Sequence, residues 1–333
     1  MLNKIAKYAR ELPLSDLHIH SNEPMAIRVH GEIESMPNDM IKRKDVEDFL
    51  NSILDDAQRT HLDKHRDIDF AIAHEELRFR VNAYHTSNGP AIVMRKIETK
   101  LPSMKDLNLP KAVIDIANES NGLVLVTGPT GSGKSTTLAA LVDKINMERT
   151  DNIITIEDPI EFIHHSKKCI VSQREVGRDA MSFGSALKAI LREDPDVILL
   201  GEMRDFETVS LALTAAETGH LVFATLHTNG APNSINRIID VFPSAQQAQA
   251  RSQISQSLRL VVTQKLIRRI DKPGRVSAFE VMVCNTAVSN LIRENKIFQI
   301  DQAMQTGKTH GMVTMEDSIK DLVSKGIIAY EEA

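Results

Sequence analysis

Residues 122–137 read Gly-Leu-Val-Leu-Val-Thr-Gly-Pro-Thr-Gly-Ser-Gly-Lys-Ser-Thr-Thr, and no other stretch of the chain is as informative. The segment fills the pattern G-x-x-x-x-G-K-[ST] of a phosphate-binding loop. A short apolar run, Leu123 to Val126, precedes the loop and suits a buried parallel strand. From Thr136 onward, apolar residues recur at helical spacing. A strand before the loop and a helix after it favour nucleotide binding over a glycine-rich turn without a ligand.

Each residue type in this loop suits phosphate chemistry. Glycines let the backbone N–H groups point inward at phosphate oxygens, where a Cβ would clash. Lys134 is predicted to reach the β- and γ-phosphates of ATP, and Ser135 to ligate Mg²⁺. The following helix turns its positive end toward the anion. The predicted nucleotide-binding residues are Gly128, Pro129, Thr130, Gly131, Ser132, Gly133, Lys134, Ser135 and Thr136.

The composition is that of a soluble globular protein. The chain has 333 residues, enough for two domains, of which 42% are hydrophobic and 26% charged. The net charge of −5 gives no support to nucleic-acid binding, which favours a basic surface. Two cysteines without a C-x-x-C pair argue against a zinc site and a disulfide framework. No apolar run approaches membrane-spanning length, so we expect a cytoplasmic protein, peripheral to a membrane only through partners.

The order of the elements predicts two α/β domains. Residues 1–98 combine an amphipathic N-terminal helix with strands at 26–33, 69–73, 77–84 and 91–97 and a helix at 46–62. Residues 99–112 contain two prolines and read as a linker. Residues 113–333 begin with repeated strand–helix alternation, which predicts a mostly parallel sheet with right-handed crossovers. The predicted strands there are 123–126, 153–156, 197–200 and 221–226, and the predicted helices are 136–147, 182–192 and 205–218.

Beyond Pro243 the pattern becomes mostly helical. We expect a helix that ends near Lys265, Arg268 and Arg269, a strand near 276–283, and a final helix from Thr314 to Gly326.

Acidic and histidine side chains follow three of the predicted parallel strands. They are Glu157, Asp158 and Glu161 after strand 153–156, Glu202 and Asp205 after strand 197–200, and His227 after strand 221–226. Ligand sites in such sheets lie at the carboxyl ends of the strands, so these groups should meet the phosphate loop. A nucleotide hydrolase needs an acid for Mg²⁺, a base for the attacking water and a group that senses the γ-phosphate. Acids after strands also cap helices, and we assign that role to Asp205.

The acid after strand 197–200 departs from the common P-loop pattern. Many P-loop enzymes place Asp-Glu there, whereas this chain has Gly201 before Glu202. We therefore expect Glu202 to act on the metal itself or through water, and Glu161 to be the base.

Four segments together resemble the secretion ATPase family and, within it, the type IV pilus retraction ATPases. These segments are the phosphate loop, the acidic segment 156–161, the segment 191–205 and the histidine segment 218–228. The segment 287–294 is similar to the C-terminal motif associated with retraction, but Val288 and Ser289 replace the usual residues. The four-cysteine zinc motif and the extra N-terminal domain of many extension ATPases are missing, which favours retraction.

The resemblance implies a RecA-like C-terminal domain, a PAS-like N-terminal domain and a homo-hexameric ring that binds ATP and Mg²⁺. It implies work on a pilus through an inner-membrane platform protein, without nucleic acid. Arginines of the small domain would reach the phosphates, and Arg80 and Arg95 match those positions; a solvated strand face is the alternative. His220 and His227 would sense the γ-phosphate.

Three other functions stay open from the residues alone. The chain could be an extension or type II secretion motor, or an accessory ring subunit with weak activity of its own. A RecA-like helicase is the third, but the absence of Trp and only three Tyr leave no platform for base stacking.

Overall fold

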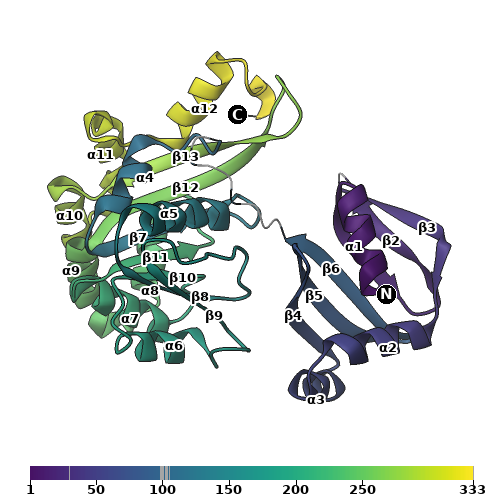
Figure 1. Ribbon diagram of the computed structural model, residues 1–333. Helices are drawn as coiled ribbons and strands as arrows, with labels where there is room; N and C mark the ends of the chain where they lie inside the picture. The colour runs from purple at the N-terminus through teal and green to yellow at the C-terminus, as the bar shows by residue number, and fades with distance from the viewer. Residues whose placement is uncertain (30, 98–100, 102–103, 105, 333) are drawn as a thin grey trace. The chain divides into compact units, whose positions relative to one another are not determined.

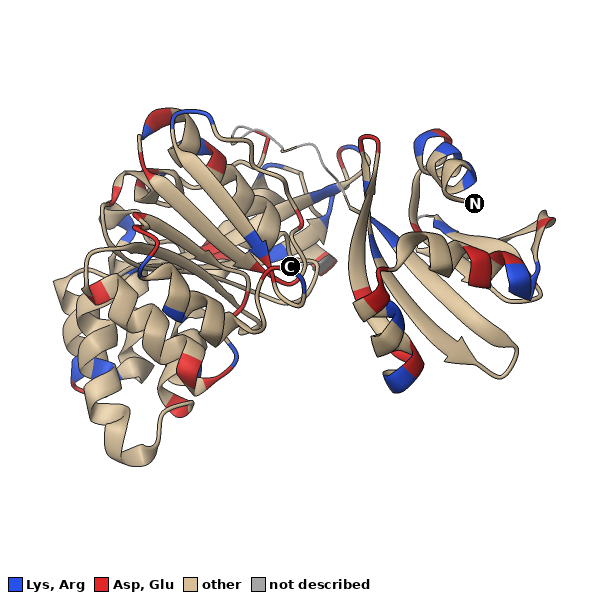
Figure 2. Ribbon diagram, turned by 60° about the horizontal axis from the view of Figure 1, so that its bottom comes forward, with Lys and Arg blue, Asp and Glu red and all other residues tan. Residues whose placement is uncertain are grey.

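The computed structural model describes residues 1–29, 31–97, 101, 104 and 106–332 (Figure 1). The chain divides into two compact units, Met1–Lys100 and Leu101–Ala333, each with a hydrophobic core of its own. The predicted linker 99–112 falls at this division, and its residues 99, 100, 102, 103 and 105 lie outside the described part. Basic and acidic residues are interspersed on each unit in the view of Figure 2. Within the described ranges, no helix is long and apolar enough to cross a bilayer.

The first unit is an antiparallel sheet of six strands in the order β3-β2-β1-β6-β5-β4, with three helices. The elements are α1 (Leu2–Glu11), β1 (Leu14–His20), β2 (Glu23–Val29), β3 (Glu32–Ile41), α2 (Arg43–Ile53), α3 (Asp56–His65), β4 (Asp67–His74), β5 (Leu77–Thr86) and β6 (Gly89–Ile97).

Hydrophobic periodicity accounts for the core of this unit. In α1, Ile5, Ala6 and Ala9 are buried on one face, which confirms the predicted amphipathic helix. In β5, Phe79, Val81 and Ala83 are fully buried while Arg80 stays half-exposed, as strand alternation predicts. The two groups belong to one apolar cluster, so α1 and the sheet share a core.

Two elements of the first unit differ from the prediction. The expected helix 46–62 is two helices, because Leu54 is extended and Asp55 caps α3 by accepting from the N–H of Gln58. The expected strand 26–33 is two strands, β2 and β3, with Gly31 at a positive φ of 93° between them.

The second unit contains a seven-stranded sheet in the order β13-β12-β7-β11-β10-β8-β9. All neighbouring pairs are parallel except β12 with β13. The strands are β7 (Gly122–Thr127), β8 (Asn152–Glu157), β9 (Ile170–Glu175), β10 (Val197–Leu200), β11 (Leu221–Leu226), β12 (Leu258–Arg268) and β13 (Arg275–Val283). The predicted fold class, a RecA-like domain with a mostly parallel sheet beside a smaller α/β domain, is confirmed.

Helices cover both faces of this sheet. They are α4 (Lys111–Asp115), α5 (Lys134–Glu148), α6 (Phe183–Ile190), α7 (Phe206–Glu217), α8 (Ala231–Asp240), α9 (Gln247–Ser257), α10 (Thr286–Arg293), α11 (Ile300–Thr306) and α12 (Met315–Ser324), with single 3₁₀ turns at Ile116–Asn118, Ser244–Gln246, Ile297–Gln299, Lys308–His310 and Tyr330–Glu332.

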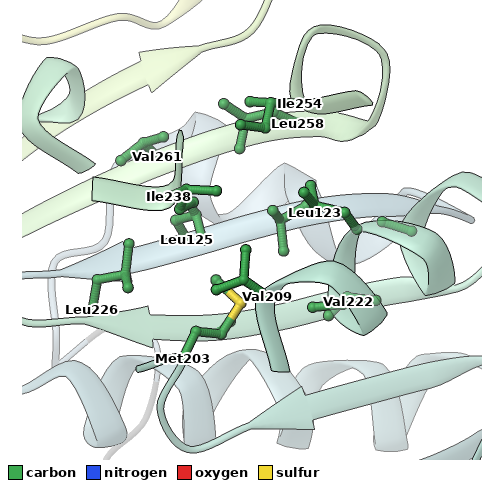
Figure 3. Close-up of a cluster of buried hydrophobic side chains, with 14 of the residues drawn as sticks. Leu123, Leu125, Met203, Val209, Val222, Leu226, Ile238, Ile254, Leu258 and Val261 are labelled. Carbon is green, nitrogen blue, oxygen red and sulfur yellow. The ribbon is translucent and has the colours of Figure 1, made fainter. Parts of the chain in front are cut away.

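Successive residues of β7 enter different cores because side chains alternate along a strand. Leu123 and Leu125 belong to the cluster formed with α6 to α11, part of which is shown in Figure 3. Val124 and Val126 belong to the cluster formed with α4 and α5. All four are fully buried, which is the expected environment of a central parallel strand.

The main correction in the second unit concerns β12. We expected a helix ending near Lys265, but residues 258–268 form a strand between β7 and β13. Another strand, β9, was not predicted at all. The predicted caps of two helices are confirmed: Asp205 accepts from the N–H of Thr208, and Thr314 accepts from that of Asp317.

Candidate nucleotide-binding site

The phosphate loop runs from the carboxyl end of β7 to the first residue of α5. Gly128, Gly131 and Gly133 have positive φ values of 133°, 78° and 92°. A Cβ on Gly128 would lie 2.4 Å from the backbone oxygen of Gln264 and 2.8 Å from Oγ of Ser132. The loop therefore needs glycine at 128 for both conformation and space.

Lys134 is buried at the start of α5. Its Nζ donates to the backbone oxygens of Gly128, at 2.8 Å, and Pro129, at 3.1 Å. Burial lowers the pKa of Lys134, and the negative charges of Glu202 and Glu161 act against that shift. Both predicted carboxylates therefore lie close enough to act electrostatically on the lysine of the phosphate loop.

Glu202 follows β10 and contacts two basic side chains. Nη2 of Arg204 donates to its Oε2 at 2.6 Å, and Nε2 of His227 lies 3.4 Å from the same oxygen. Burial raises the pKa of Glu202, but the Arg204 hydrogen bond and the His227 charge outweigh it, so the net shift is downward. An ionised carboxylate beside the phosphate loop can serve as a metal ligand.

The end of β10 and the start of α5 also share a small cavity of about 40 Å³. Ser135, Glu157, Gly201 and Thr225 are among the residues that line it. The hydroxyl of Ser135 is thus close to the strand end that presents Glu202. A hydroxyl, a carboxylate and the phosphates of the nucleotide are the oxygen ligands that Mg²⁺ prefers, so these residues fit that ion.

Glu161 is exposed between two buried apolar neighbours, Ile160 and Phe162. This alternation turns the carboxylate toward solvent and leaves it within electrostatic reach of Lys134. A partly solvated carboxylate near the phosphates has access to a water molecule, as a general base requires.

The structure separates His220 from the site. The N–H of Gly122, which begins β7, donates to the backbone oxygen of His220, whereas the phosphate loop leaves β7 after Thr127. A six-residue strand spans roughly 20 Å, so His220 lies far from the phosphate loop of its own chain, and its role as a sensor of the γ-phosphate stays a prediction. His227 follows the opposite end of β11, next to Glu202.

The two predicted arginines lie in the first unit and are described within it. Arg80 on β5 and Arg95 on β6 occupy directly opposed positions. Their side chains are 47% and 66% exposed, so each guanidinium is available for further contacts. Arg95 donates to Asp16 at 2.8 Å, and Arg80 lies 3.9 Å from Asp69. Two adjacent guanidiniums on one sheet face can bind an anion.

Two residues at the site were not predicted. Arg204 lies within the segment 191–205 and stands only two positions after Glu202, but no role was predicted for it. Gln264 is buried on β12, and its Nε2 donates to the backbone oxygen of Ser132 at 3.5 Å. No local sequence signal links Gln264 to a loop more than a hundred residues earlier.

A family model described as "Type II/IV secretion system protein" matches residues 1–333. A twitching motility protein of Neisseria gonorrhoeae is 49% identical over 92% of this chain and 82% of its own length. The type IV pilus retraction ATPase PilT of Pseudomonas aeruginosa is 46% identical over 100% of this chain and 96% of its own length.

A crystal structure of the pilus retraction motor PilT with bound ADP is also similar, with a TM-score of 0.92 and 44% identity. The match covers 99% of this chain and 94% of that one. The resemblance to secretion ATPases and pilus retraction ATPases that the motifs indicated is therefore confirmed. With full-length matches in sequence and structure, this chain belongs to the type II/IV secretion system protein family.

Proposed function

We propose that the chain is an ATP-hydrolysing motor that powers the retraction of type IV pili. The observation that supports hydrolysis is the position of Lys134 in the phosphate loop, where the charges of Glu161 and Glu202 both act on it. Full-length relatives named for pilus retraction and twitching motility support the direction of the work.

Each residue has a proposed role in the reaction. The loop amides and Lys134 bind the phosphates, and Glu161 accepts a proton from the attacking water. Ser135 and Glu202 hold Mg²⁺, which neutralises phosphate charge when bound. His227 responds to the γ-phosphate through Glu202. Arg80 and Arg95, from the small domain, stabilise charge that develops in the transition state.

The proposed assembly is a cytoplasmic homo-hexameric ring at the inner membrane. It engages the platform protein of the pilus machinery, and domain rotation transmits the work. The working division is a small domain of residues 1–98, a linker of residues 99–112 and an ATPase domain of residues 113–333.

Purified chain should hydrolyse ATP, and Lys134→Ala should lower kcat at least about 100-fold, because one preorganised donor to the reacting group has effects of that size. Lys144→Ala is the matched control. It removes a half-buried lysine of the same helix, whose ion pair in the described structure is with Glu148 and not with the phosphate loop, so kcat should stay within about twofold. Unchanged turnover in Lys134→Ala would contradict the proposed role of Lys134 in hydrolysis.

A cell test separates retraction from extension. Cells that lack this gene should still assemble pili but should fail to retract them. Cells without pili would instead indicate an extension motor.

A further inference from the structure

The segment that presents Glu161 is fastened to the ends of β8 and β9 by side-chain hydrogen bonds to its backbone. Gln173 on β9 contributes two of them: its Nε2 donates to the oxygen of Phe162 at 2.8 Å, and its Oε1 accepts from the N–H of His164 at 2.7 Å. Glu175, at the end of the same strand, accepts from the N–H of Ile160 at 3.1 Å. The backbone is thus held on both sides of Glu161.

Glu157, the last residue of β8, is joined to this segment through Gln173, whose Nε2 donates both to Glu157 and to the backbone oxygen of Phe162. Thr155 and Gln173 donate to Oε1 of Glu157 at 2.7 and 3.1 Å, which fixes the orientation of the carboxylate. We call Glu157, Gln173 and Glu175 the loop cradle.

Glu157 also faces the phosphate loop. It lines the cavity of about 40 Å³ together with Ser135, and this space is large enough for a water molecule. Burial raises the pKa of Glu157, and the charge of Glu161 acts in the same direction. This half-buried carboxyl group accepts from Thr155 and Gln173, and these two contacts indicate a structural role at the end of β8.

We propose that Glu157 is a positioning residue for hydrolysis: by orienting Gln173 it fixes the backbone that follows Glu161 and so sets where the base carboxylate stands relative to Ser135 and Lys134. This inference rests on the proposed function, because it assumes that Glu161 is the base. In this proposal Glu157 needs no contact with phosphate or with the attacking water. Its effect is geometric, and a displacement of about 1 Å at a reacting group can lower a rate about 100-fold.

The two substitutions at 157 separate positioning from charge. Glu157→Gln keeps an oxygen that accepts from Thr155 and Gln173, so kcat should stay within about threefold of wild type. Glu157→Ala removes the acceptor that orients Nε2 of Gln173, so kcat should fall at least about tenfold while KM for ATP changes less than about threefold. Ser172→Ala, at an exposed position on the same strand as Gln173, is the matched control and should behave as wild type.

Hydrogen exchange gives a readout that is independent of turnover. Amides in residues 158–164 should exchange faster in Glu157→Ala than in wild type or Ser172→Ala, with melting temperature measured in parallel. Gln173→Ala should raise exchange in the same segment, and the double variant should lose less activity than the two single losses combined.

Two results would overturn the proposal: kcat and exchange of 158–164 unchanged in Glu157→Ala, or Glu157→Gln as inactive as Glu157→Ala. The first result would show that Glu157 does not hold the segment that carries Glu161. The second would show that the role of Glu157 depends on its charge. Failure of the proposed function would look different, since wild type and Lys134→Ala would then share the same low turnover while the exchange difference persisted.

Discussion

Substituting the first and the middle glycine of the phosphate loop with alanine should give very different losses of stability. Both positions have positive φ, but a Cβ on Gly131 meets nothing within 4 Å, whereas a Cβ on Gly128 meets the Gln264 oxygen at 2.4 Å. Gly131→Ala should therefore cost about 1–2 kcal/mol, the penalty of a left-handed L-residue. Gly128→Ala adds overpacking against backbone to its conformational strain, for a total of about 2–6 kcal/mol.

Thermal unfolding of the two purified variants measures this difference. For a unit of this size, each kcal/mol lowers the melting temperature by about 2–4 °C, so Gly128→Ala should melt clearly below Gly131→Ala. Binding of a fluorescent ADP analogue, measured below both transitions, should be weakened more by Gly128→Ala, because its loop must shift away from Gln264. A Gly128→Ala variant as stable as Gly131→Ala would refute the steric reasoning.

Two further predictions concern pH. Burial raises the pKa of Glu202, and the hydrogen bond from Arg204 lowers it, so Arg204→Ala should raise this pKa and move the acid limb of the kcat/KM profile to higher pH. If the acid limb does not move, the rate does not depend on the ionisation of Glu202. Burial lowers the pKa of His164 to about 4 from 6.5, so the unfolded chain binds a proton first as pH falls. The free energy of unfolding should therefore drop by about 3 kcal/mol between pH 6.5 and 4, as measured by urea titration. His164→Gln should lose less stability over the same range, and an equal loss in both proteins would indicate that His164 is exposed.

The central part of the second unit was predictable because its signals are local. The strand at 123–126, the loop and the following helix are specified by neighbouring residues, as is the cap at Asp205. The ends of parallel strands also lie at one edge of a sheet, which is why the sequence alone could assign Glu161 and Glu202 to the lysine of the loop.

Strand β12 was not predicted because its burial depends on β7 and β13, the two strands between which it lies. Residues 260–264 are buried between β7 and β13, so this part of the strand is a continuous buried run that ends in Gln264 and gives no period-two pattern. The helix predicted over 46–62 failed for the opposite reason, since a short break at Leu54 interrupts an otherwise helical pattern.

Long-range side-chain contacts at the site could not be predicted from the sequence, because they depend on which strands lie next to each other. Gln173 holds the backbone of Phe162 and His164, but it lies on a strand that was not predicted. His220 and His227, in contrast, flank a strand that was predicted with its observed bounds, 221–226, so their separation could be inferred from the sequence.

Because Gly128 lies close to the backbone of Gln264, β12 supports one side of the phosphate loop. Farther along, β12 continues into a hairpin with β13, where Ile267 and Val276 pack against Leu322 of α12. The residue of β12 beside the phosphate loop and the residue that packs against α12 are thus only three positions apart on one strand. An insertion between 264 and 267 would separate these two sets of contacts without changing either of them.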